Sequence, residues 1–232
     1  MKRKKFFIFD LDGTLLNNTH IGFMRVNQNL EMMGMPPVSE KFLRSHWGIP
    51  AKDIWKLICE ESGATPEKEE LLLKNDVYMS KIMDYKASAK LMLAIAMVKK
   101  FDIFTGILTS RTAASLDVAI KQTGLDLTLF DYIQTITHFP YHKPNGRVFG
   151  PAINWAMAKK LLPEDIVYFG DTIKYDYAAT LNANPPLDFV GIISGVNTYE
   201  EFLAAGLPTC RITTYEKLPH FLHHSIKELV EA

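Results

Sequence analysis

Short apolar runs alternate with segments of helical periodicity along most of the chain, and this alternation most constrains its fold. Each run has the length of a strand, and each intervening segment is long enough for one helix. Such alternation predicts a parallel sheet with helices on both faces. The expected strands are Lys5–Phe9, Ile103–Leu108, Tyr132–Thr137, Ile166–Phe169 and Phe189–Ile193, with a weaker one at Cys210–Ile212. The expected helices are Ser88–Lys100, Thr112–Thr123, Val148–Lys160, Tyr175–Asn182, Tyr199–Ala204 and Leu218–Val230.

The stretch between the first two expected strands breaks the alternation. Residues 17–86 contain no convincing strand, and the stretch is far longer than an ordinary connection. Apolar residues recur there at helical spacing, the last series being Leu71, Tyr78, Ile82 and Tyr85. We therefore expect an inserted all-helical domain at residues 17–86. Residues 1–16 and 87–232 would form an α/β, Rossmann-like core of three layers.

The composition argues against several classes of protein. The 26 Lys and Arg residues equal the 26 Asp and Glu residues, so no basic excess favours nucleic acid or membranes. The first apolar run, Phe6–Phe9, is too short for a signal peptide, and no run approaches a transmembrane length. The two cysteines lack the spacing of a zinc site. We expect a cytoplasmic monomer or homodimer that binds neither nucleic acid nor membranes.

Polar side chains follow four of the expected strands. Each would be unremarkable alone, because such residues are common in turns and at helix starts. The carboxyl ends of parallel strands, however, meet at the edge of the sheet where ligands bind. Their shared position therefore predicts one common site. The side chains are Asp10 and Asp12, then Thr109, Ser110 and Arg111, then Lys143, and finally Asp171 and Asp176.

Four carboxylates in one cleft require positive charge beside them. Two like charges about 4 Å apart repel by roughly 4 kcal/mol at an effective dielectric of about 20. Oxygen ligands favour a hard cation, and a site shared with phosphate favours Mg²⁺. Lys143 adds positive charge, and the Thr109 hydroxyl with nearby backbone N–H groups would hold phosphate oxygens. The set predicts phosphoryl transfer through an aspartyl-phosphate.

The four motifs, in this order, resemble those of the haloacid dehalogenase superfamily of phosphohydrolases. The helical insertion is similar to the cap of its phosphoglycolate phosphatase and β-phosphoglucomutase branch. The resemblance spans the chain from about Lys5 to the C-terminus. The matching segments are Asp10-Leu11-Asp12-Gly13-Thr14-Leu15, Thr109-Ser110, Lys143-Pro144, and Gly170-Asp171-Thr172 through Asp176.

The resemblance implies roles for the acidic residues. Asp10 would be the nucleophile and a metal ligand. Asp12 would protonate the leaving group and then activate water, while its backbone carbonyl binds Mg²⁺. Asp171 would ligate the metal, and Asp176 would either ligate metal-bound water or anchor Lys143. The dehalogenase branch lacks the acid that matches Asp12, so dehalogenation is disfavoured.

The resemblance also implies how phosphate and substrate are bound. Thr109, the Ser110 amide and Lys143 would bind the phosphate, and Lys143 would take part in catalysis. The segment His46-Trp47-Gly48-Ile49-Pro50 is similar to the branch's specificity loop. We expect His46, Trp47 and, at the first hinge, His20 to select the substrate. The alternative is that Trp47 packs between cap and core.

The sequence thus predicts a Mg²⁺-dependent phosphatase that hydrolyses a small phosphorylated metabolite, similar to phosphoglycolate, a sugar phosphate or a nucleotide. A phosphomutase of the β-phosphoglucomutase type shares the first half-reaction and is the alternative function. A binding module without catalysis is the alternative from another class, although all four acids are present. A phosphonate hydrolase would need a Schiff-base lysine from the cap, for which Lys52 and Lys56 are the nearby candidates.

Overall fold

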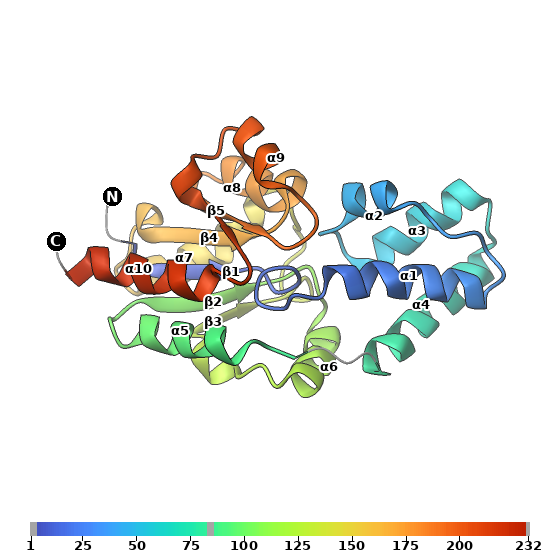
Figure 1. Cartoon of the computed structure of the whole chain (residues 1–232), viewed down its shortest axis with the longest axis horizontal. Helices are drawn as coiled ribbons and strands as arrows, with labels where there is room; N and C mark the ends of the chain where they lie inside the picture. The colour runs from blue at the N-terminus through green and yellow to red at the C-terminus, as the bar shows by residue number, and fades with distance from the viewer. Residues whose placement is uncertain (1–3, 83–85, 231–232) are drawn as a thin grey trace.

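A wholly parallel, six-stranded sheet forms the centre of the molecule (Figure 1). The computed structural model describes residues 4–82 and 86–230, with the side chains of residues 226–230 left aside. The strand order is β3-β2-β1-β4-β5-β6, so the chain runs outward from β1 in one direction and then in the other. The strands are β1 (Phe6–Phe9), β2 (Phe104–Leu108), β3 (Tyr132–Gln134), β4 (Ile166–Gly170), β5 (Asp188–Ile193) and β6 (Ile212–Thr214).

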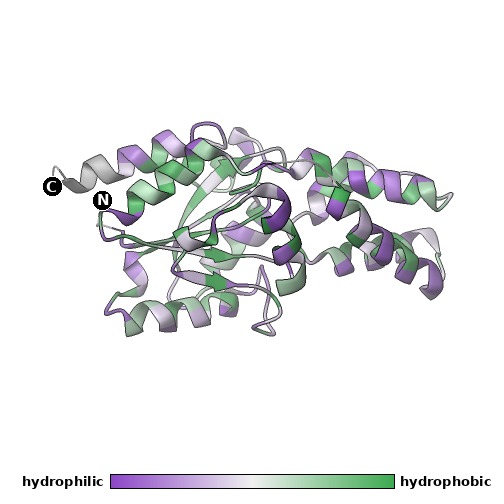
Figure 2. Cartoon of the chain, turned by 90° about the horizontal axis from the view of Figure 1, so that it is seen from below, coloured by the Kyte–Doolittle hydropathy of each residue, from purple (hydrophilic) through white to green (hydrophobic). Residues whose placement is uncertain are grey.

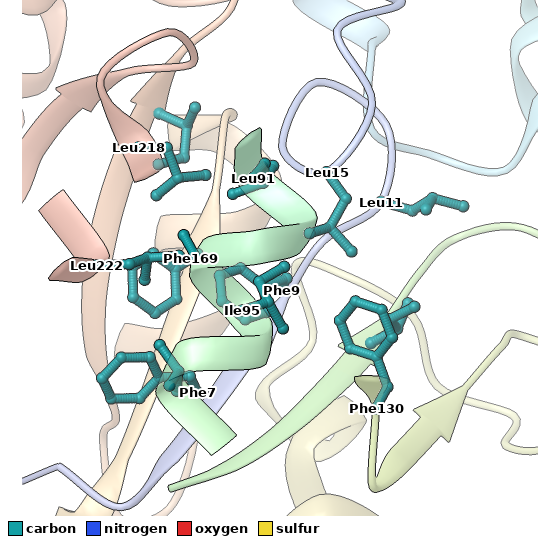
Figure 3. Close-up of a cluster of buried hydrophobic side chains, with 14 of the residues drawn as sticks. Phe7, Phe9, Leu11, Leu15, Leu91, Ile95, Phe130, Phe169, Leu218 and Leu222 are labelled. Carbon is teal, nitrogen blue, oxygen red and sulfur yellow. The ribbon is translucent and has the colours of Figure 1, made fainter. Parts of the chain in front are cut away.

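Helices cover both faces of this sheet and complete three layers. Side chains alternate across a strand, so Phe7 and Phe9 of β1 join one core cluster while Phe6 and Ile8 join the other. The first cluster is shown in Figure 3, where Phe9 and Phe169 stack with ring centroids 4.6 Å apart. It lies under α5 (Ala89–Lys99), α6 (Ala113–Thr123) and α10 (Leu218–Val230). The second lies under α7 (Gly150–Ala158), α8 (Ala178–Leu181) and α9 (Tyr199–Ala204).

The insertion after β1 is helical, as predicted. Four helices gather at one end of the molecule, away from the sheet (Figure 1). They enclose a buried cluster of their own that includes Leu30, Trp55 and Leu72. In Figure 2 the strands are mainly hydrophobic, whereas these helices carry alternating hydrophobic and hydrophilic residues. The helices are α1 (Thr19–Met32), α2 (Glu40–His46), α3 (Ala51–Ser62) and α4 (Pro66–Ile82).

The predicted fold class is confirmed, while the limits of several elements differ. Strand β3 ends at Gln134 because Thr135 enters a turn in which the His138 N–H donates to its carbonyl. A 3₁₀ turn at Thr209–Arg211 displaces the last strand to Ile212–Thr214. The expected helix Tyr175–Asn182 is a π turn at Ile173–Tyr177 followed by α8. The domain boundaries near residues 17 and 86 stay a prediction.

The apolar series that indicates helix α4 in the sequence does not mark the buried face of that helix. Leu71, Tyr78 and Ile82 are 47%, 62% and 65% exposed, while Tyr85 lies outside the described residues. The inner face instead carries Leu72, Asp76 and Met79. A charged residue therefore occupies the middle of the buried stripe, where it meets a cation of α1.

Within the described ranges, no helix combines the length and the apolar character needed to cross a membrane.

Candidate active site

Three carboxylates meet at the carboxyl ends of neighbouring strands. Asp10 follows β1, Asp171 follows β4, and Asp176 lies on the π turn beyond it. All three are buried, and each offers an oxygen atom within 4.8 Å of the others. This all-oxygen set fits a hard divalent cation such as Mg²⁺. The strand ends therefore converge as the sequence predicts.

Gly13 allows the first loop to approach this cluster. Its φ angle is +74°, which an L-residue rarely adopts, and a methyl group there would lie 2.1 Å from Asp171 Oδ2. The Ser194 hydroxyl donates to the same carboxylate oxygen at 3.1 Å. The glycine of the first motif thus makes room for the acid of the fourth.

Lys143 lies between two of the carboxylates. Its Nζ atom is 3.0 Å from Asp10 Oδ1 and 2.6 Å from Asp176 Oδ1, and the side chain is 1% exposed. Burial alone would lower the pKa of Lys143, but Asp10 and Asp176 hold that pKa above its usual range. The ammonium group therefore stays charged and offsets part of the acidic cluster.

Asp176 is the anchor of this lysine. Its Oδ1 atom accepts hydrogen bonds from Lys143 and from the Tyr168 hydroxyl, which lies 3.1 Å away. Its Oδ2 atom accepts from both the amide and the hydroxyl of Thr172. Of the two roles left open by the sequence, anchoring Lys143 is the one that these contacts show.

The acidic cluster favours a bound proton or a cation. Burial raises the pKa of Asp10 to about 7, with Lys143 opposing the rise and Asp176 adding to it. Burial, with Asp176 next, also holds the pKa of Asp171 well above its usual range. A divalent cation would take the place of these protons.

Asp12 is held apart from that cluster by Arg111. The guanidinium binds the carboxylate with two parallel bonds of 2.7 Å, from Nε to Oδ2 and from Nη2 to Oδ1. Asn18 donates a third bond of 2.6 Å to Oδ1. Burial alone would raise the pKa of Asp12, but Arg111 and then Asn18 hold it below its usual range. Such a paired fork fixes a carboxylate in orientation as well as in charge.

Arg111 is a site residue whose partner the sequence does not reveal. It follows the second motif directly, and no spacing rule connects it with an acid 99 positions earlier. The available signal was its place at the carboxyl end of β2, beside β1 in the sheet. A cation at that point lies beside the residues that follow β1.

The second motif lies at the carboxyl end of β2, beside the end of β1. Thr109 is 3% exposed at the end of β2, and its hydroxyl accepts a hydrogen bond from the Arg111 amide. The Ser110 hydroxyl donates at 2.8 Å to the Gly48 carbonyl, which lies in the loop of residues 46–50, the cap loop. Ser110 therefore links this motif to the loop that was expected to select the substrate.

A family comparison agrees with this geometry. The family model described as "Haloacid dehalogenase-like hydrolase" matches residues 7–190, which is most of the chain. The chain belongs to this family. The prediction of the superfamily, and of a hydrolytic enzyme, is thereby confirmed.

Known proteins resemble this family member over most of their length. "Putative pyrophosphatase PpaX" of Clostridium perfringens is 26% identical over 183 residues, which cover 77% of this chain and 80% of that protein. A predicted phosphoglycolate phosphatase from Haemophilus somnus has a TM-score of 0.69 at 20% identity, covering 84% of this chain and 88% of that one. The β-phosphoglucomutase of Clostridium difficile has a TM-score of 0.71 at 17% identity, covering 99% and 100%. These structures share the fold.

The three expected substrate-selecting residues of this hydrolase lie in different surroundings. Trp47 packs its indole on α1, where a methyl group at Gly22 would lie 2.2 Å from Cη2. The His46 ring lies 4.5 Å from the Phe42 ring, and its Nδ1 atom lies 2.9 Å from the Phe42 carbonyl. His20 is exposed on the first turn of α1. Packing is thus visible for Trp47, and substrate selection by all three stays a prediction.

The last turn of α2, directly before the cap loop, rests on the core through hydrogen bonds to its backbone. The Tyr175 hydroxyl and the Lys174 ammonium both donate to the Ser45 carbonyl, at 3.2 and 2.9 Å. A cavity of about 320 Å³ lies beside them, between cap and core, with Trp47 and Thr172 in its wall. Trp47 of the loop and the segment that follows Asp171 therefore line the same hollow.

Proposed function

We propose that the protein is a Mg²⁺-dependent phosphatase that hydrolyses a small phosphorylated metabolite through an aspartyl-phosphate on Asp10. The observation that carries this proposal is the position of the Asp10 carboxylate. It lies 3.0 Å from the Lys143 ammonium and within the oxygen cluster that Asp171 and Asp176 complete. A buried carboxylate with a cation on one side and metal-type ligands on the other suits attack on phosphorus.

The site contains residues for both the formation and the hydrolysis of the aspartyl-phosphate. Asp10 attacks the phosphorus atom, and the P–O bond to the leaving group breaks. Asp12 takes a proton from the water that cleaves the aspartyl-phosphate and gives it to the leaving oxygen of the next turnover, which requires Arg111 and Asn18 to release the carboxylate while it carries the proton. Lys143 offsets negative charge on the phosphoryl oxygens, and the Thr109 hydroxyl binds one of them.

The acidic residues suit Mg²⁺ as the cofactor. Asp10, Asp171 and the backbone carbonyl of Asp12 would hold it, and Asp176 would bind a water molecule of the metal. When bound, it would neutralise negative charge on the phosphate. The name of the Clostridium perfringens relative supports hydrolysis at a phosphoryl group.

The test is phosphate release from a panel of sugar phosphates, nucleotides, pyrophosphate and phosphoglycolate, with and without Mg²⁺. We expect release that requires the metal and that falls by at least about a thousandfold in Asp10→Asn. Asp117→Asn, at an exposed acid of α6, is the matched control and keeps wild-type rates. Full activity in a folded, Mg²⁺-loaded Asp10→Asn variant would contradict the mechanism. Transfer of the phosphoryl group to a second sugar position, without free phosphate, would identify a phosphomutase instead.

A further inference from the structure

A cavity of about 820 Å³ lies in the core, at the loop that carries Lys143. The loop of residues 139–147 supplies most of its wall, and residues 182–184 with Gly150 and Ile153 of α7 complete it. Among the described residues that line it, none belongs to the cap, and neither Lys143 nor any of the four site acids is included. Cavities of about 300–1,000 Å³ are typical of small-molecule sites. The space is therefore a candidate site of its own.

Two aromatic side chains form part of the wall. The rings of Phe139 and Tyr141 lie with their centroids 5.4 Å apart and their planes at 60°. Pro144 and Ile153 add apolar surface. Aromatic groups contact a further ring favourably at such separations, either offset or edge to face. The wall therefore suits a ligand that contains a planar ring.

Arg147 brings positive charge to this wall. Its guanidinium lies 5.1 Å from the centroid of the Tyr141 ring, and its Nη1 atom donates to the Tyr141 hydroxyl at 2.7 Å. That bond leaves the edge formed by Nε and Nη2, the fork that binds a carboxylate or a phosphate with two parallel bonds. No Asp or Glu is among the described residues that line the cavity. The charge of the wall therefore favours an anion.

The backbone of Arg147 is fixed before any ligand binds. The Asn145 Oδ1 atom accepts a hydrogen bond from the Arg147 amide at 3.0 Å and caps the 3₁₀ turn Gly146–Phe149. A methyl group at Gly146 would lie 2.0 Å from the Asn182 carbonyl oxygen, so the turn packs closely on the residue that follows α8. An arginine held at both its backbone and its tip loses little conformational freedom when it binds an anion.

Side-chain amides supply the remaining polar groups of the cavity. Asn182 and Asn184 lie in its wall, and the Asn182 Nδ2 atom donates to the Pro144 carbonyl at 3.1 Å. Within residues 4–82 and 86–230, no donor is hydrogen-bonded to Asn182 Oδ1 or to the Asn184 side chain. An amide can both donate and accept, as can the polar edge of a nucleobase. These groups therefore match a heteroaromatic ring better than a hydrocarbon one.

The competing interpretation is that two surface loops merely leave a gap that water fills. In that case the contact between Arg147 and Tyr141 would serve the fold alone. Contacts of an exposed cation contribute little to stability, so the fold gains little from holding the guanidinium there. Apolar surface gathered in a hollow with a polar rim is typical of ligand sites in soluble proteins. The combination of rings, amides and a fixed cation favours a ligand.

We propose that this cavity is a second binding site, and that its ligand is a nucleoside phosphate. The base lies against Phe139 and Tyr141, the amides meet the edge of the base, and Arg147 binds the phosphate. The proposal is independent of the phosphatase reaction at Asp10, because none of the reacting groups lines the cavity.

The test is calorimetry in metal-free buffer with AMP, GMP, CMP and UMP as probes. Asp10→Asn protein is used so that no probe is hydrolysed. We expect at least one nucleotide to bind, and Arg147→Met to weaken that binding by at least about tenfold. Tyr141→Phe keeps the ring but frees the guanidinium tip, so it should cost roughly threefold. The parent nucleoside and ribose 5-phosphate should each bind at least about tenfold more weakly than the nucleotide.

Two control variants in the same Asp10→Asn background locate the binding. Thr109→Ala removes a phosphate-binding hydroxyl of the proposed active site and should leave nucleotide binding unchanged. Lys121→Met removes an exposed cation of α6 and should also have no effect. Arg147 is likewise exposed, so thermal unfolding of Arg147→Met should match that of Lys121→Met, which separates binding from folding.

Photolabelling with the azido derivative of the bound nucleotide gives the position directly, and we expect the label within residues 139–153. Binding that Thr109→Ala abolishes and Arg147→Met leaves intact would assign the nucleotide to the active site and overturn the proposal. Ribose 5-phosphate or the nucleoside binding as tightly as the nucleotide would contradict the roles given to the rings or to Arg147. No binding of any of the four probes at millimolar concentration would also overturn it.

Discussion

At the scale of single residues, the site is organised by pairs of opposite charge. Lys143 takes its place between Asp10 and Asp176, and Arg111 fixes Asp12. The sequence predicts the acids and the lysine, because each follows a strand. Of the pairings, the family resemblance offers only that of Lys143 with Asp176, since the partner of Asp12 depends on side-chain directions across neighbouring strand ends. Arg111 shows this, because its partner is set by the adjacency of β1 and β2 alone.

Arg111 should control how well Asp12 transfers protons. Replacement by Met removes both bonds to the carboxylate, so we expect kcat to fall by about ten- to a hundredfold with little change in KM. The pKa of Asp12 should rise, which moves the limb of the pH–rate profile that reports Asp12 to higher pH. Steady-state kinetics between about pH 4 and about pH 8, a span that brackets the usual carboxyl range, measure both effects. Wild-type kcat together with a pH–rate profile in which neither limb moves would show that Arg111 plays no such part.

The buried acids should make stabilisation by Mg²⁺ depend on pH. The carboxyl of Asp10 titrates near pH 4 in an unfolded chain and at about 7 in the folded protein. Between these values the unfolded state holds fewer protons, so this group destabilises the metal-free fold increasingly as pH rises. Mg²⁺ competes with those protons, and its stabilising effect should therefore grow as pH rises through this window.

Thermal unfolding with and without Mg²⁺, at several pH values, measures this effect. Asp171→Asn is the control, because it removes a proposed ligand from the cluster and should abolish most of the metal-dependent shift in Tm. A shift in wild-type Tm that stays constant or shrinks as pH rises would contradict the role given to these carboxylates.

At the scale of elements, periodicity predicts the existence of a helix more reliably than it predicts which side of that helix is buried. The sheet strands and α5, α6 and α10 follow from apolar runs and caps. In α4 the apolar residues Leu71, Tyr78 and Ile82 mark the solvent side, because the inner stripe contains Asp76. An acid paired with Arg25 of another helix looks like a surface residue in the sequence. Tertiary pairing thus overrides the local pattern.

Neighbouring leucines of α4 test this assignment. Leu72 is fully buried in the cap cluster, so Leu72→Ala should destabilise the protein by about 2–4 kcal/mol. Leu71 is 47% exposed, and Leu71→Ala should change the free energy of unfolding by less than about 0.5 kcal/mol. Urea unfolding of the two variants provides the comparison. A larger loss of unfolding free energy in Leu71→Ala than in Leu72→Ala would show that the side of α4 that carries Leu71 is the buried one.

At the scale of the whole molecule, the parallel sheet brings distant motifs to one edge and the insertion covers that edge. The reversal of strand order at β1 puts the ends of β1, β2 and β4 side by side, and hence Asp10, Thr109 and Asp171. This convergence follows from topology and was predictable. The contacts of the cap were not, because they join side chains such as Ser110 and Tyr175 to backbone carbonyls that any sequence supplies.

The account's central claim is that Asp10 carries the phosphoryl group during turnover. The most direct measurement is an acid quench of Mg²⁺-loaded enzyme during turnover of a labelled substrate from the active panel, followed by peptide mapping of the label. We predict a phosphoryl group on Asp10 that forms and decays at rates compatible with turnover and that is absent from Asp10→Asn. Turnover with no labelled peptide, or a label at another residue that persists in Asp10→Asn, would contradict the claim.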